Sequence, residues 1–217
     1  MRHKRKFGLY LVTDRELSLG RPLEAIVEAA ASGGVSLVQL REKSVSTREY
    51  VEIARRIQNV LKLRGIPLVI NDRVDVALAV GAEGVHLGQE DMPYPEARKV
   101  LGRKAIIGLS VENMDQALEA EKLDVDYLGV SPVFLTPTKP DTKAPWGLDG
   151  LGRLRQRSRH VLIAIGGINS SNALQVLEAG ADGLAVVSAI CSAPAPEEAA
   201  RRLRETIDRH QQEKGQL

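Results

Sequence analysis

The stretch Gly180-Ala-Asp-Gly-Leu184 decides the fold class, because it joins the end of a helical segment to the start of a short aliphatic run. The same junction occurs at Gly34-Val-Ser-Leu-Val38, Gly81-Ala-Glu-Gly-Val85 and Asp124-Val-Asp-Tyr-Leu128. The junctions recur roughly every 45 to 55 residues, the length of two strand–helix units, so we expect them to precede alternate strands. The glycines that open three of them, Gly34, Gly81 and Gly180, are placed where a helix ends in a left-handed residue.

Short runs of Val, Ile and Leu alternate with amphipathic segments along the whole chain. We expect strands at Leu9–Thr13, Leu37–Leu40, Leu68–Ile70, Val85–Leu87, Ala105–Leu109, Tyr127–Val130, Val161–Ile165 and Leu184–Val187. The expected helical segments include Leu23–Ala31, Thr47–Leu63 and Ser171–Ala179. This alternation predicts a parallel sheet with crossover helices.

Eight units of about 27 residues predict a single-domain (β/α)8 TIM barrel that spans residues 1–217. Two solvated tails are expected, a short basic one at Met1–Lys6 and a polar one from about Arg209 to Leu217. A doubly wound open sheet is the alternative. However, Leu11-Val-Thr-Asp14 lacks the glycine-rich loop that usually follows the first strand of such a sheet.

Composition excludes several classes of protein. The net charge of the 217 residues is +2 and aromatic residues make up 3%, which disfavours nucleic acid as a partner. The single cysteine, Cys191, fits a reducing compartment, and no apolar run approaches the roughly 18 residues of a membrane span. We therefore expect a cytoplasmic protein with small-molecule partners, without signal peptide or membrane contact, and with an aliphatic interior; its oligomeric state stays open.

Basic and amide side chains follow the second expected strand. Strand periodicity places Val35, Leu37, Gln39 and Arg41 on one face. If Val35 and Leu37 fill the barrel interior, Gln39 and Arg41 rise toward the mouth, where catalytic residues of such barrels lie. The alternative is a charged strand end that faces solvent.

Two acidic residues follow the third and fourth expected strands. Asp72 and Asp91 would project from neighbouring strand ends about 5 Å apart, where they could share one hard cation. Mg²⁺ is usually held by carboxylates, water and substrate phosphate. The alternative is that each residue caps a helix, Asp72 one near Arg73 and Asp91 one that begins at Pro93.

The last two expected strands lead into small residues that suit a phosphate. Gly166-Gly167 follows the seventh strand and Ser188-Ala189 the eighth, the usual phosphate position in these barrels. One long irregular stretch, 131–147, holds Lys139 and Lys143 and has the character of a functional loop.

No general base or nucleophile is suggested by the sequence. The four histidines are His3, His86, His160 and His210, and we expect His86 to be a hydrogen-bonded wall residue of the barrel. Arg41, Lys43, Lys139 and a metal would instead converge on anions. Such a site stabilises departing negative charge, as phosphoryl and diphosphate chemistry requires.

Seven motifs in this order resemble the thiamine phosphate synthase family. They are Gln39-Leu-Arg-Glu-Lys43, Asn71-Asp-Arg73, His86-Leu-Gly-Gln-Glu-Asp91, Gly108-Leu-Ser110, Pro132-Val-Phe-Leu-Thr-Pro-Thr-Lys139, Ile165-Gly-Gly-Ile168 and Val187-Ser188. The resemblance covers roughly Phe7 to Arg204. It implies a Mg²⁺-dependent barrel transferase that joins hydroxymethylpyrimidine diphosphate to hydroxyethylthiazole phosphate and releases diphosphate.

The resemblance also implies a role for each matching position. Gln39, Leu40, Arg41, Glu42, Lys43, Asn71, Ser110 and Lys139 would bind the pyrimidine diphosphate, with Arg41, Lys43, Lys139 and Ser110 acting in catalysis. Thr136, Pro137, Thr138, Gly167, Val187 and Ser188 would hold the thiazole phosphate, and Asp72 and Asp91 the Mg²⁺. The loop 131–147 would close over both substrates.

Three other functions fit the same barrel. A thiazole tautomerase-like isomerase would use a histidine after the sixth strand, but Ser131-Pro-Val-Phe134 has none. A non-catalytic regulator of the thiamine pathway would not need the acidic pair. A sugar-phosphate isomerase or epimerase would need a base at the mouth and would turn over without metal. Ser131 also departs from the family pattern, in which we expect glycine.

Overall fold

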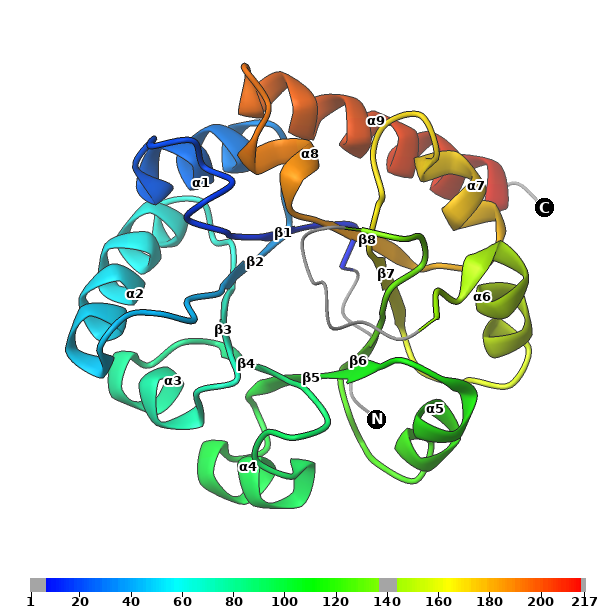
Figure 1. Ribbon diagram of the computed structural model, residues 1–217, viewed down its shortest axis with the longest axis horizontal. Helices are drawn as coiled ribbons and strands as arrows, with labels where there is room; N and C mark the ends of the chain where they lie inside the picture. The colour runs from blue at the N-terminus through cyan, green and yellow to red at the C-terminus, as the bar shows by residue number, and fades with distance from the viewer. Residues whose placement is uncertain (1–6, 137–143, 216–217) are drawn as a thin grey trace.

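The computed structural model describes residues 7–136 and 144–215, and its eight parallel strands close into a barrel (Figure 1). The strands are β1 (Leu9–Val12), β2 (Leu37–Leu40), β3 (Leu68–Asn71), β4 (Gly84–Leu87), β5 (Ile106–Val111), β6 (Tyr127–Val130), β7 (Leu162–Ile165) and β8 (Gly183–Val186). Closure is completed by β1 and β8, where Leu11 lies opposite Val186. The (β/α)8 barrel is confirmed, and the open doubly wound sheet is not formed.

Helices surround this barrel on its outside (Figure 1). They are α1 (Leu23–Ser32), α2 (Thr47–Lys62), α3 (Val74–Val80), α4 (Tyr94–Leu101), α5 (Met114–Ala120), α6 (Gly147–Arg155), α7 (Ala173–Glu178), α8 (Ser188–Cys191) and α9 (Pro196–Gly215). Each expected helical segment lies within two residues of an observed helix at either end. In the part of the chain that the structure describes, no helix is long and apolar enough to cross a membrane.

The expected tail from about Arg209 is helical as far as the structure describes it, and its residues are exposed apart from the buried His210. Helix α9 continues to Gly215 and buries Ala200, Leu203, Ile207 and His210. These positions are three or four residues apart and so form one face of the helix. This face packs α9 against α1, α7 and α8, as the red helix along the rim of Figure 1 shows.

The sheet separates two apolar regions of different composition. The region between strands and helices is aliphatic, as expected, and it includes Val35, which therefore does not fill the barrel interior. The interior contains Phe7, Tyr10 and Tyr127 beside aliphatic side chains such as Leu37. The expectation of an aliphatic interior is thus wrong inside the barrel, where these rings gather although aromatic residues are rare in the chain.

The helix–strand junctions behave as expected from the sequence. Gly34, Gly81 and Gly180 have φ angles of 98°, 65° and 112°. The junctions lead into β2, β4, β6 and β8, which are alternate strands of the barrel. Because parallel strands carry all their carboxyl ends to one side, this arrangement collects the residues that follow the strands around one mouth.

Candidate active site

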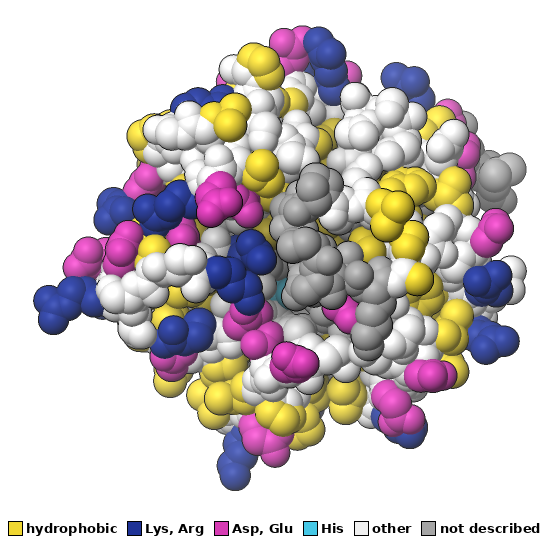
Figure 2. Space-filling view, in the orientation of Figure 1, with side chains coloured by type: hydrophobic (Ala, Val, Ile, Leu, Met, Phe, Trp, Pro, Cys, Tyr) yellow, Lys and Arg dark blue, Asp and Glu magenta, His cyan; other side chains and the backbone are white. Residues whose placement is uncertain are grey.

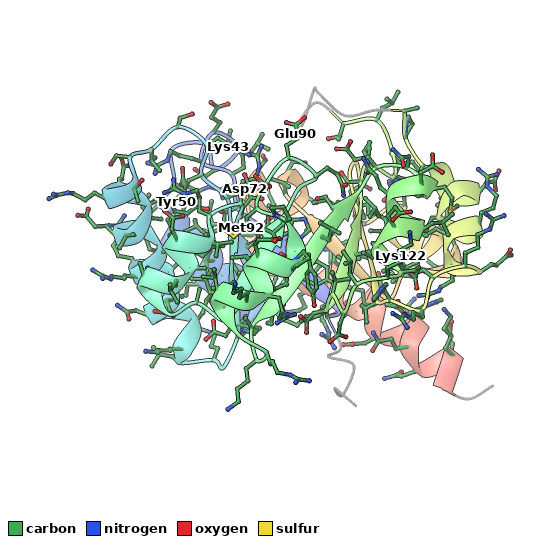
Figure 3. The ribbon with its side chains drawn as sticks, turned by 90° about the horizontal axis from the view of Figure 1, so that it is seen from below. Lys43, Tyr50, Asp72, Glu90, Met92 and Lys122 are labelled. Atoms are coloured by element: carbon green, nitrogen blue, oxygen red, sulfur yellow. The ribbon has the colours of Figure 1, made fainter. Side chains whose placement is uncertain are left out.

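A cavity of about 460 Å³ opens at the carboxyl ends of the strands. Figure 2 views this face, where basic and acidic side chains lie beside a central hollow. From the side, Lys43, Asp72 and Glu90 lie toward the same upper end of the barrel (Figure 3). The predicted site residues that line the cavity are Gln39, Arg41, Lys43, Asn71, Asp72, Asp91, Ser110, Thr136, Gly167, Val187 and Ser188. A volume of several hundred Å³ is typical of sites for small molecules.

Asp72 and Asp91 meet at this mouth. Their carboxyl groups share a hydrogen bond, and Lys43 Nζ donates to Asp72 Oδ2 at 2.5 Å. Burial and the hydrogen bond with Asp72 raise the pKa of Asp91. Burial also acts to raise the pKa of Asp72, but its bonds with Asp91 and Lys43 outweigh this and lower it. Two carboxylates forced this close favour a cation between them.

Neither acidic residue caps a helix, which removes the alternative interpretation of this pair. The residue before α3 is Arg73 and the residue before α4 is Pro93, and neither helix start receives a side-chain hydrogen bond. Asp91 Oδ2 instead accepts the main-chain N–H of Gly88 at 2.6 Å. This bond holds the Asp91 side chain back toward the end of β4.

The basic side chains line the same side of the cavity. Arg41 follows β2 and lies 3.5 Å from the Asp14 carboxylate, while its main-chain N–H donates to Thr13 Oγ1 at 3.1 Å. Gln39 and Asn71 are almost fully buried at the ends of β2 and β3. The interpretation of the β2 end as a solvent-facing segment is thus excluded for Gln39, whose side chain points into the barrel.

Small residues form the opposite side of the cavity. Gly166 and Gly167 follow β7 with φ angles of 105° and 66°, a conformation that side chains rarely adopt. A Cβ at Gly167 would lie 2.9 Å from Phe134 Cβ, so glycine also provides the space for this turn. Ser188 begins α8, directly after Val187. Main-chain groups are therefore open to a ligand at this corner.

The remaining predicted site residues differ in position. Leu40 is fully buried between the sheet and the helices, and the side chain of Glu42 pairs with Arg15 at 3.2 Å, so neither side chain lines the cavity. Only their main-chain atoms could serve a ligand there. The predicted residues Pro137, Thr138 and Lys139, and with them most of the expected closing loop, lie outside the described residues.

Three buried rings below the mouth were not predicted as site residues. Tyr10, His86 and Tyr127 line the cavity, and His86 is hydrogen-bonded within the barrel wall as expected. The alternation of inward- and outward-facing residues along β1 and β6 could have indicated the two tyrosines, since it places both side chains on the inner face of the barrel. In the region that the structure describes, no group of three or more His, Cys, Asp or Glu side chains could hold a metal ion.

In enzymes with a closed (β/α)8 barrel, the active site lies at the carboxyl ends of the strands, frequently with a phosphate-binding site after the last two strands. Residues 9–190 match the family described as thiamine monophosphate synthase, and the chain belongs to that family. The thiamine-phosphate synthase of Albidiferax ferrireducens is 56% identical over 92% of this chain and 91% of its own length. That of Syntrophomonas wolfei is 52% identical over 94% of this chain and 98% of its own.

Solved structures agree with this assignment. Thiamine phosphate pyrophosphorylase from Pyrococcus furiosus superposes with a TM-score of 0.87 at 40% identity, and the match covers 95% of this chain and 98% of that one. A 3-hexulose-6-phosphate synthase, at 18% identity and a TM-score of 0.66, shares the fold alone. The predicted resemblance to the thiamine phosphate synthase family is confirmed, and the chain is a transferase of thiamine biosynthesis.

Proposed function

We propose that this chain joins hydroxymethylpyrimidine diphosphate to hydroxyethylthiazole phosphate in two steps, with diphosphate leaving before the thiazole attacks. The observation that carries this proposal is the division of one cavity into two sides. Asp72, Asp91 and Lys43 meet on one side, and the Gly167 and Ser188 turns form the other. Two anionic groups can therefore be bound at once, with the reacting atoms between them.

The acidic and basic side would bind the pyrimidine diphosphate. Arg41 and Lys43 would neutralise the diphosphate as the bond from the methylene carbon to oxygen breaks and the oxygen takes the electron pair. Lys139 would join them. Asn71, Gln39 and Ser110 would provide hydrogen bonds to the substrate, and the main chain at Leu40 and Glu42 would contribute to the same wall.

The acidic pair fits Mg²⁺. Asp72 and Asp91 offer carboxylate oxygens in mutual contact, and the raised pKa of Asp91 reflects burial and a negative neighbour that a cation would offset. Two protein carboxylates, with water and substrate phosphate, are a usual Mg²⁺ ligand set. The bound ion would supply charge neutralisation at the leaving diphosphate.

The opposite side would hold the thiazole phosphate. Thr136, Gly167, Val187 and Ser188, with Pro137 and Thr138, would bind the phosphate through hydroxyl and main-chain N–H groups. The thiazole nitrogen uses its lone pair to form the new carbon–nitrogen bond, and no proton is transferred. The reaction written in this way therefore needs no general base.

The direct test is incubation of the purified protein with both substrates, with Mg²⁺ or with excess chelator, and detection of thiamine phosphate by chromatography. We expect product and an equal amount of diphosphate with Mg²⁺ only. Absence of product in both incubations would overturn the proposed function. Product at the same rate in chelator would overturn the metal assignment while leaving the condensation in place.

A further inference from the structure

A continuous row of hydrogen bonds crosses the floor of the cavity. Gln39 Nε2 donates to the Tyr10 hydroxyl at 2.6 Å, and this hydroxyl lies 2.8 Å from that of Tyr127. The Tyr127 hydroxyl is 3.0 Å from His86 Nδ1, and His86 Nε2 is 2.8 Å from Ser110 Oγ. The row thus begins and ends on residues assigned to the pyrimidine substrate, and Tyr10, Tyr127 and His86 between them have no role in the proposed reaction.

The barrel is shaped around these three rings. Tyr127 stacks on His86 with centroids 5.5 Å apart and 16° between the planes, and its centroid lies 5.8 Å from that of Tyr10. Inward-facing glycines make room for them. A Cβ at Gly108 would lie 2.1 Å from Tyr127 Cζ, and one at Gly129 would lie 2.9 Å from His86 Cε1. The rings are therefore held in place from several strands.

The donors in this row have one consistent direction. The Gln39 amide nitrogen can only donate, so the Tyr10 hydroxyl accepts from it and uses its own hydrogen toward Tyr127. If the Tyr127 hydroxyl donated to Tyr10 instead, the hydrogen of the buried Tyr10 hydroxyl would have no acceptor among the hydrogen bonds of the described residues. Such an unpaired buried donor is unfavourable. Tyr127 consequently donates to His86 Nδ1, and His86 carries its hydrogen on Nε2.

We infer that Tyr10, Tyr127 and His86 are positioning residues that fix the direction of the Ser110 hydroxyl. Because His86 Nε2–H donates to Ser110 Oγ, the hydrogen of Ser110 is left to point into the cavity. Gln39 retains its Oε1 as an acceptor at the other end of the row. The floor of the cavity therefore presents the Ser110 hydroxyl as a donor and Gln39 Oε1 as an acceptor to a flat nitrogen heterocycle. Which group donates and which accepts depends on Tyr10, Tyr127 and His86, which the heterocycle does not need to contact.

This inference makes a structural prediction that does not depend on turnover. In protein labelled with ¹⁵N-histidine, at a pH where His86 is neutral, we expect its signals to report Nε2–H with an unprotonated Nδ1. The signals are assigned by their loss in His86→Gln. Tyr127→Phe removes the donor to Nδ1 and should shift the tautomer toward Nδ1–H. A wild-type Nδ1–H tautomer would mean that the row runs in reverse, and it would overturn the inference, as would a tautomer that Tyr127→Phe leaves unchanged.

The kinetic test rests on the proposed function. Tyr127→Phe keeps the ring but loses the hydroxyl, so we expect the KM for the pyrimidine diphosphate to rise about tenfold while the KM for the thiazole phosphate stays within about twofold. Tyr94→Phe is the matched control, since the Tyr94 hydroxyl donates to Asp124 O on the outside of the barrel at 2.6 Å. It should change neither KM. Equal rises in both KM values for Tyr127→Phe would contradict a positioning role.

A second pair of variants keeps the test decisive if Tyr127→Phe does not fold. His86→Gln can retain an N–H near the position of Nε2, whereas His86→Asn is too short to reach Ser110. We expect the KM for the pyrimidine diphosphate to be lower in His86→Gln than in His86→Asn by about fivefold or more. Equal KM values would overturn the inference. If no variant and no wild-type protein turns over, the proposed function fails, and the tautomer measurement still decides the direction of the row.

Discussion

Asp72 shows how backbone conformation places a single residue at the mouth of the barrel. It is a non-glycine residue with φ of 63°, a left-handed conformation that costs an L-residue roughly 1–2 kcal/mol. Its main-chain N–H donates to His86 O at 2.8 Å, which keeps the backbone in place. In this conformation the Asp72 carboxyl group interacts with that of Asp91. Such local strain is most common at functional sites.

Replacement of Asp91 tests the metal role. In Asp91→Asn the side-chain oxygen can still accept from Gly88 N–H, so we expect the melting temperature to change by less than about 3 °C. The kcat/KM at limiting Mg²⁺ should fall more than about tenfold, since loss even of outer-shell metal partners has an effect of that size. Mg²⁺ titrations of initial rates measure this. Asp208→Asn on α9, where Asp208 pairs with Arg204, is the control. Unchanged Mg²⁺ dependence in Asp91→Asn would contradict the assignment.

A second residue-scale prediction concerns the phosphate corner. Ser188→Asp places a negative charge at the start of α8, where it would repel the thiazole phosphate. We expect the KM for that substrate to rise about tenfold or more and the KM for the pyrimidine diphosphate to stay within about threefold. Ser32→Asp, at the exposed end of α1, adds the same charge far from the cavity and serves as the control. Steady-state kinetics with each substrate varied in turn measures both KM values. An unchanged KM for the thiazole phosphate in Ser188→Asp would contradict a phosphate-binding role for this corner.

At the scale of elements, the turn after β7 depends on backbone conformation and space together. Gly167 has φ of 66°, and an added Cβ would also approach Leu135 O to 3.1 Å, in addition to the close contact with Phe134. Gly65, after α2, has nearly the same φ of 64°, but nothing lies within 4 Å of its Cβ position. These two glycines separate the effect of conformation from the effect of crowding.

Alanine at each glycine gives a matched comparison. Gly65→Ala should lower the free energy of unfolding by about 1 kcal/mol, the strain of a left-handed alanine. Gly167→Ala should lower it by about 2–4 kcal/mol, because overpacking adds to that strain. Urea unfolding followed by circular dichroism measures both, and Gly167→Ala alone should also weaken binding of the thiazole phosphate. Equal losses of stability would show that the turn relaxes around the new methyl group.

At the scale of the whole molecule, closure of the barrel leaves none of the described strands with a free edge, and α9 packs against α1 near one end of the chain and α7 and α8 near the other. Cys191 reports on this arrangement. It is the last residue of α8 and is fully buried, with its Sγ 3.8 Å from Val12 O. Burial raises the pKa of its thiol to about 11. The thiol is therefore both covered and protonated in the folded protein.

We expect Cys191 to react with a disulfide reagent at pH 8 only when the barrel unfolds. The reaction rate should follow the unfolded fraction through a urea titration, as measured by absorbance of the released thiolate. The raised pKa of the Cys191 thiol also sets the direction in which the stability of the protein changes with pH. The unfolded thiol ionises first as the pH rises, so the contribution of this thiol to stability is complete below its ordinary pKa and is lost above it. Rapid reaction without urea would show that the α8–α9 region opens locally.

Local pattern was sufficient for most of the fold. Alternation of β-branched runs with amphipathic segments identified every strand to within two residues, because backbone geometry and one-sided burial act over only a few neighbouring residues. The meeting of Asp72 and Asp91 was also predictable, since each follows a strand and parallel strands end at one mouth. The sequence analysis did not indicate the C-terminal helix α9, because most of its residues are polar and its buried face is narrow.

By itself, the sequence determined the order of the elements, the family and the end of the barrel at which the predicted site residues gather. Only the tertiary structure decided the contents of the barrel interior. Tyr10 and Tyr127 are 117 residues apart in the chain, yet their hydroxyls are within hydrogen-bonding distance. Contacts of this kind depend on the closure of the sheet and on the space left by inward-facing glycines, and neither is encoded in the periodicity of a single segment.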